Sequence, residues 1–235
     1  MKISVIIPTL NEARNIGAAI ASGTCEEGKS EVIVVDAGST DDTVQIARKH
    51  AIVLSTARGR ALQMNAGARH ADGEILLFLH ADSVLHPQAF NGLRSTLLDP
   101  AIGGGTFTLR FDSDGFWLRV YSKFTRFKFR YFHYGDQGIF VRRSVFEQLG
   151  GFKEVPLMED LDFLLRLRKA GRAALIDLPV TTSARRFREN GPFRQELLNV
   201  LLVCLYICGA KPQTLAKWYW GDSKPLGTPD SEKGW

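Results

Sequence analysis

The chain has 235 residues, of which 45% are hydrophobic and 23% are charged, a composition that is typical of a folded globular protein and excludes a low-complexity or disordered chain. Its formal net charge of +5 suits an acidic small molecule or an anionic membrane surface as a partner. Nucleic acid is not expected as a partner, because the sequence contains no helix-turn-helix, zinc-finger or RNA-binding motif.

The cysteines and the apolar segments bear on the cellular compartment. Cys25, Cys204 and Cys208 do not form a disulfide framework or a set of metal ligands, which favours a reducing compartment. The apolar run at residues 3–7 is too short for a signal peptide, and residues 197–208 are too few to span a bilayer. We therefore expect a cytoplasmic protein and leave open a peripheral contact with the inner face of the membrane.

Up to residue 79 the sequence alternates between strand patterns and helix patterns. This alternation predicts a sheet of parallel strands that is covered by helices. The expected strands are residues 3–7, 31–36, 52–54 and 74–79, and the expected helices are residues 13–21, a helix capped by residues 39–42 that runs to residue 50, and residues 60–70.

The pattern changes after Pro100. The three glycines at residues 103–105 predict a break in the chain, followed by an exposed strand at residues 106–111. Aromatic and basic residues then interleave over residues 116–131, before a buried strand at 138–141 and an amphipathic helix at 159–170. We expect one domain over residues 1–190, with a nucleotide-binding half at 1–100 and an acceptor half at 101–190, and a helical appendage and tail over 191–235.

Two predicted strands end in acidic residues, at the sheet edge where α/β folds bind ligands. Asp36 ends the second strand, and a later apolar run leads through His80 to Asp82. A single carboxylate flanked by His and Ser suits a divalent cation whose remaining positions go to phosphate and water. Two structural alternatives stay open: Asp36 stabilises only the turn at residues 37–39, and Asp82 only caps the next helix, which Pro87 opens.

Three further clusters of polar residues have both a structural and a functional interpretation. Thr9 and Glu12 follow the first strand, where they can cap a helix or hydrogen-bond a ribose. Glu159 and Asp160 begin a predicted helix, whose dipole favours carboxylates, while a general base is the functional alternative. Arginines at residues 185–188 either bind a diphosphate bidentately or form a solvated basic face. Dinucleotide redox chemistry and P-loop hydrolysis are unsupported, because neither glycine-rich motif is present.

Several short motifs occur in order along residues 3–190. They are Ser4-Val-Ile-Ile-Pro-Thr-Leu-Asn-Glu12, Val35-Asp-Ala-Gly-Ser-Thr-Asp-Asp-Thr43, Asn65-Ala-Gly67, Gly73-Glu74, His80-Ala-Asp-Ser83, and Gly150-Gly-Phe152 followed by Glu159-Asp160. Together they resemble the family-2 glycosyltransferases of the GT-A fold, and within them a small bacterial subgroup, the transferase 2 type associated with radical-SAM and selenoprotein-type gene neighbourhoods. The resemblance implies an α/β fold with a Rossmann-like, mainly parallel central sheet flanked by helices.

The resemblance also implies an activity. It is that of an inverting transferase, which moves a sugar from a nucleotide-diphosphate sugar to an acceptor hydroxyl with the help of Mg or Mn. Asp82 matches a metal-binding Asp, Asp160 matches the catalytic base with Glu159 beside it, and Arg186 corresponds to an arginine that neutralises the departing diphosphate. The positions implied for nucleotide binding are Pro8, Thr9, Glu12, Asp36, Arg60, Ala81 and Asp82, and those on the acceptor side are Asp136 and Gln137.

The chain departs from the family pattern at two places. His80 stands where the first Asp of an Asp-x-Asp motif would be, which removes a negative charge and predicts weaker or pH-dependent metal binding. Ser183 and Phe187 stand where the Gln and Trp of a Gln-x-x-Arg-Trp motif would be, which argues against a processive polysaccharide synthase.

The acceptor and the class of function retain alternatives. The aromatic and basic residues at 116–132, with the apolar segment 197–208 near Trp218 and Trp220, are compatible with an amphiphilic or lipid-linked acceptor. Closure of the core or a homodimer interface is the alternative for the same residues. A non-catalytic sugar-nucleotide-binding protein and, less favoured, a nucleotidyltransferase are the competing functions.

Overall fold

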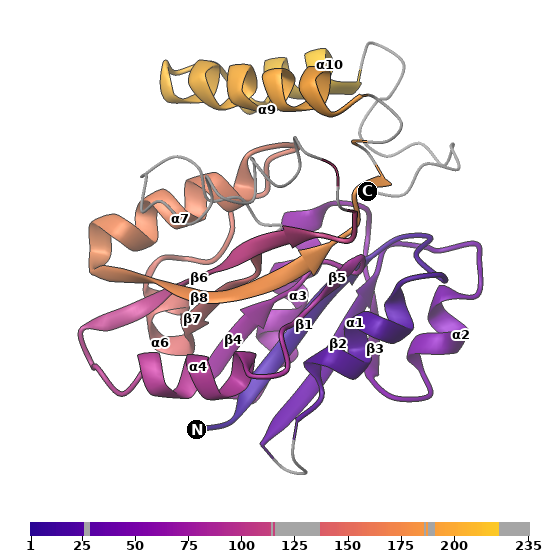
Figure 1. Cartoon of the computed structure of the whole chain (residues 1–235), viewed down its shortest axis with the longest axis vertical. Helices are drawn as coiled ribbons and strands as arrows, with labels where there is room; N and C mark the ends of the chain where they lie inside the picture. Colours follow the sequence, from indigo (N-terminus) through magenta and orange to yellow (C-terminus); the bar gives the residue numbers. More distant parts are fainter. Residues whose placement is uncertain (26–28, 114, 116–136, 186, 188–190, 221–235) are drawn as a thin grey trace.

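The computed structural model describes residues 1–25, 29–113, 115, 137–185, 187 and 191–220. They fold around one sheet that helices cover on both faces (Figure 1). In the described part of the chain the sheet has eight strands in the order β3-β2-β1-β4-β7-β6-β8-β5. The strands are β1 (Ile3–Thr9), β2 (Ser30–Asp36), β3 (Ile52–Ser55), β4 (Ile75–Phe78), β5 (Ser83–Val84), β6 (Ile102–Phe111), β7 (Ile139–Arg142) and β8 (Arg172–Thr182), and the helices are α1 (Ile16–Gly23), α2 (Thr43–Ala47), α3 (Arg60–His70), α4 (Ala89–Thr96), α6 (Arg143–Gln148), α7 (Glu159–Ala170), α9 (Pro192–Ile207) and α10 (Pro212–Trp220).

The first half of the chain forms the parallel part of the sheet. β1 pairs in parallel with both β2 and β4, and β2 pairs in parallel with β3. The strand order therefore reverses at β1, and doubly wound sheets open a ligand crevice at such a point, outside the carboxyl ends of the strands. The predicted parallel, helix-covered arrangement is confirmed.

The second half of the chain extends the sheet with mixed pairing. β7 runs antiparallel to both β4 and β6, whereas β6 runs parallel to β8. The short strand β5 pairs antiparallel with the end of β8. This last pairing brings the segment that follows β4 next to the segment that follows β8, so two distant parts of the sequence meet at the crevice.

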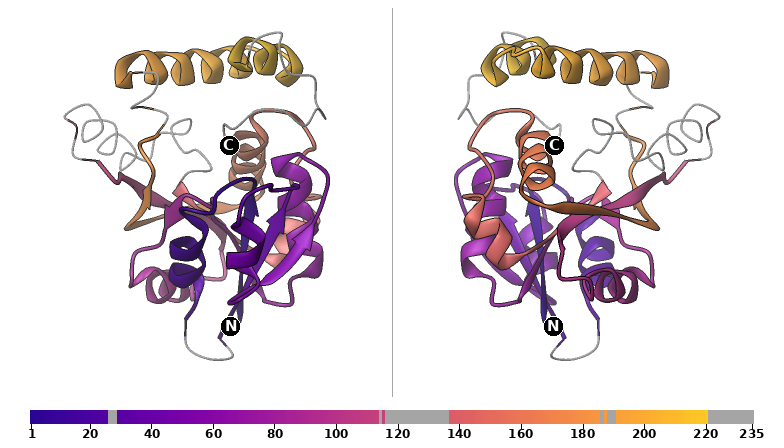
Figure 2. Two further views of the ribbon diagram at one scale, coloured as in Figure 1. Left: turned by 90° about the vertical axis from the view of Figure 1, so that its right-hand side faces the viewer. Right: turned by 90° about the vertical axis from the view of Figure 1, so that its left-hand side faces the viewer.

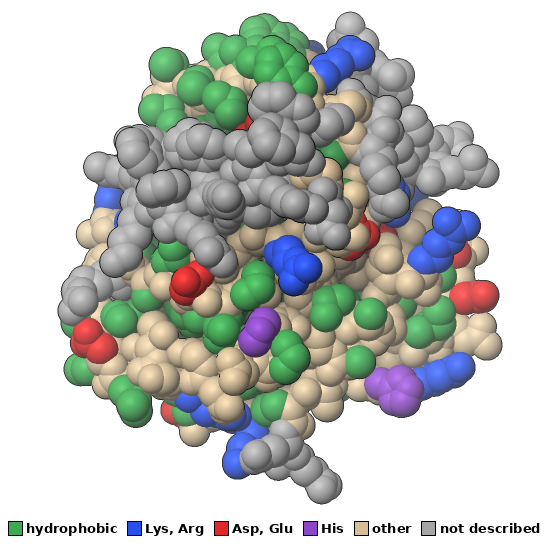
Figure 3. Space-filling model, in the orientation of Figure 1, with side chains coloured by type: hydrophobic (Ala, Val, Ile, Leu, Met, Phe, Trp, Pro, Cys, Tyr) green, Lys and Arg blue, Asp and Glu red, His purple; other side chains and the backbone are tan. Residues whose placement is uncertain are grey.

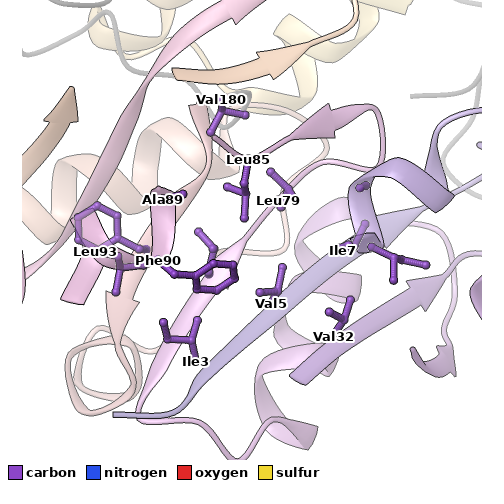
Figure 4. Close-up of a cluster of buried hydrophobic side chains, with 14 of the residues drawn as sticks. Ile3, Val5, Ile7, Val32, Leu79, Leu85, Ala89, Phe90, Leu93 and Val180 are labelled. Carbon is purple, nitrogen blue, oxygen red and sulfur yellow. The ribbon is translucent and has the colours of Figure 1, made fainter. Parts of the chain in front are cut away.

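The two largest clusters of the core lie on opposite faces of the sheet. Side chains of a strand alternate between the faces, so Val5 and Ile7 of β1 lie in the cluster shared with α1 and α4 (Figure 4), while Ile6 lies in the cluster shared with α3 and α7. Each large aliphatic or aromatic side chain buried in this way contributes about 1.5 to 3 kcal/mol. Burial on both faces explains why β1 is a continuous apolar run.

The glycines at residues 103–105 do not break the chain, so this prediction is wrong. They lie inside β6, where a Cβ on Gly105 would stand 1.9 Å from the carbonyl oxygen of Ala174, and one on Gly104 would stand 2.5 Å from that of Phe140. Only glycine lets the neighbouring strands approach so closely. The strand predicted at 106–111 is confirmed as part of β6, but its predicted exposure is wrong, because residues 104–109 are buried.

The helices α9 and α10 form the predicted helical appendage. Gly209 joins them with φ at 95°, a left-handed conformation that glycine adopts without strain. The pair forms a layer across the end of the molecule opposite the N-terminus (Figure 2). The Tyr206 hydroxyl donates a hydrogen bond of 3.2 Å to Asp162 Oδ1 and so connects α9 to α7. No helix in the described ranges is long and apolar enough to cross a membrane.

Glu196 makes the stability of this appendage depend on pH. Burial raises the pKa of the Glu196 carboxyl to about 7, against a smaller opposite effect of its hydrogen bond with Asn199. A pKa raised on folding stabilises the protein fully below the unfolded value and loses that contribution as the pH rises through the folded value. Because Glu196 is partly exposed, we discount the shift for solvent screening to about 1 to 2 kcal/mol.

The expected result is that Glu196→Gln stabilises the protein by about this amount at about pH 8 and changes little at about pH 5. Thermal unfolding of both proteins across this range measures the difference. Glu147→Gln, at an exposed position of α6, is the matched control and should leave the pH profile unchanged. If stability depended on pH in the same way in wild type and in Glu196→Gln, the pKa of Glu196 would not differ between the folded and unfolded states.

Candidate active site

A pocket opens at the carboxyl edge of the sheet, where the two halves of the chain meet. Its walls come from the end of β1 and the residues that follow it, helix α3, the segment after β4, the end of β6, and the end of β8 with the residues that follow it. Six of the seven residues predicted to bind a nucleotide lie in the walls, and only Asp36 does not. The lining residues are Pro8, Thr9, Leu10, Glu12, Arg60, Gln63, His80, Ala81, Asp82, Phe111, Thr182, Ser183, Arg185 and Phe187.

One side of the pocket is built by coupling α3 to α7. Asn65 of α3 accepts a hydrogen bond from the backbone N–H of Phe152 at 2.9 Å and donates one to its carbonyl at 2.8 Å. The Phe152 ring packs on those of Phe78 and Phe163, with centroids 4.8 Å and 4.6 Å apart. The Asn65 and Gly150-Gly-Phe152 motifs, far apart in the sequence, therefore fix the start of α7 against the start of α3.

Arg60 is held by the two acidic residues at the start of α7. Its Nη2 lies 3.0 Å from Asp160 Oδ2, and its Nε donates a hydrogen bond to Glu159 Oε1. Glu159 and Asp160 are only 2% and 5% exposed, and they contact the pocket through Arg60, which lines it. The predicted contact of Arg60 with the nucleoside stays a prediction, and no motif in the sequence indicates this ion-pair cluster.

The backbone conformation at the start of α7 orients Glu159 and Asp160. Met158, the residue before the helix, has φ at 70°, a left-handed conformation that is uncommon for a residue with a side chain. Such strain costs about 1 to 3 kcal/mol and concentrates at functional sites. The helix dipole favours both carboxylates in the first turn, and Phe163 and Leu164 anchor the helix in the core.

A second ion pair joins the segment after β1 to the segment after β8, and both of its members line the pocket. Arg185 Nη2 lies 2.9 Å from Glu12 Oε1, although 173 positions separate the two residues. The other oxygen of Glu12 accepts a hydrogen bond of 2.6 Å from Asn15. Of the arginines predicted at residues 185–188, the one that the described residues place in the pocket is Arg185. Arg186, which the sequence favoured for the diphosphate, lies outside the described residues, so its role stays a prediction.

Gln63 is a pocket residue that the sequence reasoning missed. Its side chain is buried, and its Nε2 donates hydrogen bonds of 2.9 Å to the carbonyl of Thr9 and 2.7 Å to that of Val35. One amide therefore satisfies the strand-end carbonyls of both β1 and β2, which otherwise cost free energy when buried. A polar residue on the buried face of a predicted helix was the available signal.

Asp36 lies at the end of β2 and holds the turn that follows. Its carboxylate accepts backbone hydrogen bonds of 2.9 Å from Gly38 and from Ser39, and another from the Ser39 hydroxyl. Asn11, with φ at 54°, joins this turn to the loop after β1 through a 2.8 Å bond from Thr40 N–H. Asp36 therefore stabilises the turn at residues 37–39, as the structural alternative predicted. Its predicted contact with the nucleoside stays a prediction.

Asp36→Ala is expected to weaken nucleoside diphosphate binding by about 1 to 3 kcal/mol, the cost of losing a hydrogen bond to a buried partner. Isothermal titration calorimetry measures this change. Ser39→Ala is the control, because it removes two hydrogen bonds of the Ser39 hydroxyl, one donated to Asp36 and one accepted from the backbone N–H of Asn11, and keeps the carboxylate. Equal losses in both variants would assign the effect to the turn, and unchanged affinity in a folded Asp36→Ala protein would remove Asp36 from the donor site.

Asp82 lies in the pocket and does not cap the next helix. The helix α4 begins at Ala89 with Gln88 as its N-cap residue, so the capping alternative is wrong. The strand β5 intervenes, and the pairing of Ser83 with Thr182 includes a hydroxyl hydrogen bond of 3.0 Å. Because β5 belongs to the sheet, Asp82 stands at the junction of β4 and β8.

The residues around Asp82 fit a divalent cation that arrives with a ligand. Among the described residues no group of three or more His, Cys, Asp or Glu side chains could hold a metal ion by itself. The carboxylate of Asp82 and the imidazole of His80 line the same pocket and are ligands that Mn accepts. Such a pair leaves most coordination positions to phosphate oxygens and water, which is the usual arrangement for Mg with nucleotides.

The two residues predicted for the acceptor side are placed differently. Asp136 lies outside the described residues. Gln137 is fully buried and does not line the pocket. Their contact with an acceptor stays a prediction.

The model of the glycosyl transferase family 2 matches residues 4–149. The chain belongs to this family. The match covers β1 to α6 and so includes all three wall segments contributed by the first half of the chain. It confirms the family and the enzyme class predicted from the sequence, while the radical-SAM-associated subgroup stays a prediction.

One curated relative is the glycosyltransferase AglE of Haloferax volcanii, which is 31% identical over 168 residues. The match covers 64% of this chain and 55% of AglE, so the chain spans about half the length of that relative.

Solved structures confirm the GT-A fold. The mannosyltransferase PcManGT of Pyrobaculum calidifontis, in complex with GDP-Man and Mn²⁺, superposes with a TM-score of 0.64 at 24% identity, over 94% of this chain and 70% of that one. The glucosyl-3-phosphoglycerate synthase of Mycobacterium tuberculosis, in complex with Mn²⁺, UDP and glucosyl-3-phosphoglycerate, gives 0.63 at 23% identity, over 88% of this chain and 80% of that one. At these identities the likeness shows the fold alone.

Proposed function

We propose that the chain transfers a sugar from a nucleotide-diphosphate sugar to an acceptor hydroxyl with inversion, assisted by Mg or Mn. The observation that carries the proposal is the grouping of Asp82 and Arg60 in one pocket, with Arg60 bound to the buried pair Glu159 and Asp160. In this proposal Asp82 would hold the cation and Arg60 would supply a positive group in the same pocket, while the proposed base, Asp160, contacts Arg60. The family membership and the solved complexes that hold nucleotides and Mn²⁺ support it.

The donor's nucleoside would bind between the ends of β1 and β2. Thr9 Oγ1 is buried and makes no hydrogen bond to any described residue, although it lines the pocket. A buried hydroxyl without a hydrogen-bond partner costs about 1 to 3 kcal/mol, so a ligand that forms a hydrogen bond with it gains affinity. Glu12 and Asp36 would add acceptors for ribose hydroxyls.

The diphosphate would lie between Asp82 and the arginines that follow β8. Asp82, with His80 beside it, would hold the divalent cation, whose chemistry is to neutralise charge on the departing diphosphate. Arg185 lines the same pocket, where it pairs with Glu12. An arginine can donate two parallel hydrogen bonds to a phosphate. Arg186 would add a further positive charge.

Asp160 would act as the general base. The acceptor hydroxyl gives its proton to the Asp160 carboxylate while its oxygen forms a bond to the anomeric carbon. The bond from that carbon to the diphosphate oxygen breaks, and the nucleoside diphosphate leaves with the electron pair. Attack from the face opposite the leaving group inverts the anomeric carbon, and no enzyme nucleophile is needed.

A donor screen tests the proposal. Thermal shift with Mn and a panel of UDP-, GDP- and dTDP-sugars identifies the donor, and the products are then measured with soluble and amphiphilic alcohols as acceptors. We expect free nucleoside diphosphate that appears only with both substrates. Release of pyrophosphate would show a nucleotidyltransferase, and tight donor binding without turnover on any acceptor would show a non-catalytic binding protein.

A further inference from the structure

The outward face of α9 is an apolar stripe. Leu197 and Leu201 are 59% and 49% exposed and lie one helical turn apart. Trp218 of α10 is 62% exposed in the same layer. The members of this outer face, as we call it, are Phe193, Leu197, Leu201, Cys204, Ile207, Cys208 and Trp218.

The inner side of the same two helices is also apolar. Leu202 and Val203 of α9 and Leu215 and Ala216 of α10 are buried. An isolated surface helix normally presents a polar face to water, opposite its apolar stripe. Here apolar residues occupy both sides, so the outer face needs a second apolar environment.

The charge around the outer face indicates the nature of that environment. Arg194, Lys211 and Lys217 are exposed, while the one acidic residue between positions 191 and 220, Glu196, is half-buried. Figure 3 shows the corresponding end of the molecule as a hydrophobic surface with basic side chains at its edge. A second copy in a two-fold dimer would bring these cations against one another, whereas anionic lipid headgroups would neutralise them.

The shape of the appendage suits a helix that lies flat on a membrane. The 16 residues of α9 span about 24 Å. An apolar face with basic residues at its edges and a Trp is typical of helices that lie in the headgroup region. The views of Figures 1 and 2 show α9 and α10 side by side as one layer, so both helices can reach the same plane.

We propose that the outer face of α9 and α10 docks the protein onto an anionic lipid surface. The apolar stripe enters the headgroup region, and Arg194, Lys211 and Lys217 bind the anionic lipids. The strands β1 and β4 run toward this end of the molecule, so docking turns the carboxyl edge of the sheet toward the lipid (Figure 1). The docking does not depend on the chemistry proposed for the pocket.

Vesicle flotation of the full chain tests the docking. The probes are vesicles of phosphatidylcholine alone and of phosphatidylcholine with phosphatidylglycerol, each at low and at high salt. We expect binding to the anionic vesicles only, weakened by salt. The double variant Leu197→Ser/Leu201→Ser should lower the partition coefficient by roughly tenfold or more. Leu98→Ser, at a position that is 81% exposed outside the appendage, is the matched control and should bind normally.

A second pair of variants tests the charges. Lys211→Glu/Lys217→Glu should lower binding to anionic vesicles at least roughly tenfold, whereas Lys49→Glu/Lys169→Glu should change it by less than about twofold. Equal binding to neutral vesicles, no binding to any vesicle, or an equal loss in the controls would overturn the proposal. A dimer seen by light scattering that Leu197→Ser/Leu201→Ser dissociates, without lipid binding, would instead assign the outer face to contact between copies.

Discussion

Asp160→Asn is expected to lower the rate of sugar transfer by roughly 10² to 10⁴, about 3 to 5 kcal/mol of activation free energy, while donor binding persists. The amide keeps the volume of the carboxylate and can still accept a hydrogen bond from Arg60, but it does not take a proton from the acceptor. The position supports this role, because Asp160 is buried at the start of α7 and reaches the pocket through Arg60. Single-turnover rates with saturating donor measure the effect.

Glu159→Gln is the matched control for this prediction. It removes the charge next to Asp160 and weakens the hold on Arg60, but it leaves the proposed base in place. We expect a smaller loss of the transfer rate than in Asp160→Asn. Near-normal transfer by Asp160→Asn would move the base elsewhere, and Asp136, outside the described residues, would be the next candidate.

Asp82→Ala is expected to lower transfer by roughly 10² to 10⁴, because a cation that neutralises the leaving group contributes several kcal/mol to catalysis. The same variant should remove most of the increase in donor affinity that Mn produces in the wild type. Wild-type protein should bind Mn weakly without nucleotide, since Asp82 and His80 leave most ligand positions to the diphosphate. Calorimetry with and without nucleoside diphosphate measures both effects.

His80→Asn distinguishes the contribution of His80 to metal binding from that of Asp82. If His80 is a ligand, the variant should weaken Mn binding in the presence of nucleotide and remove its dependence on pH near neutrality. Tight Mn binding to the nucleotide-free protein that Asp82→Ala does not diminish would contradict a cation site at Asp82.

The parallel half of the fold could be predicted because each of its elements is specified by a pattern within one short stretch of sequence. Each strand that is buried on both faces is a continuous apolar run, and each helix between them has its own periodicity. The helix at residues 159–170 was also predictable, since its acidic start and its leucine spacing are visible within one short segment. These local patterns are enough to place Asp82 and Asp160 at the ends of secondary-structure elements.

Features that depend on distant partners could not be predicted. Gly105 looks like a chain break, and only the Ala174 carbonyl on a neighbouring strand explains it. Asp82 looks like a helix cap, because nothing near it shows that Ser83 pairs with Thr182. Arg185 is likewise one arginine among several, until β8 brings it to Glu12.

The ion-pair cluster at Arg60 also could not be predicted from the sequence. Its three members could each be proposed for a site, but their contact depends on the double hydrogen bond between Asn65 and the backbone of Phe152. The turn before α7 and the helix α3 carry separate motifs, and nothing in either motif indicates its partner.

The most direct test of the central claim is the anomeric configuration of the first product. Proton NMR of the reaction at early times gives this configuration from the coupling of the anomeric proton. A single displacement, with Asp160 as base and no covalent intermediate, predicts a product whose configuration is opposite to that of the donor. A product that retains the donor's configuration would contradict the account.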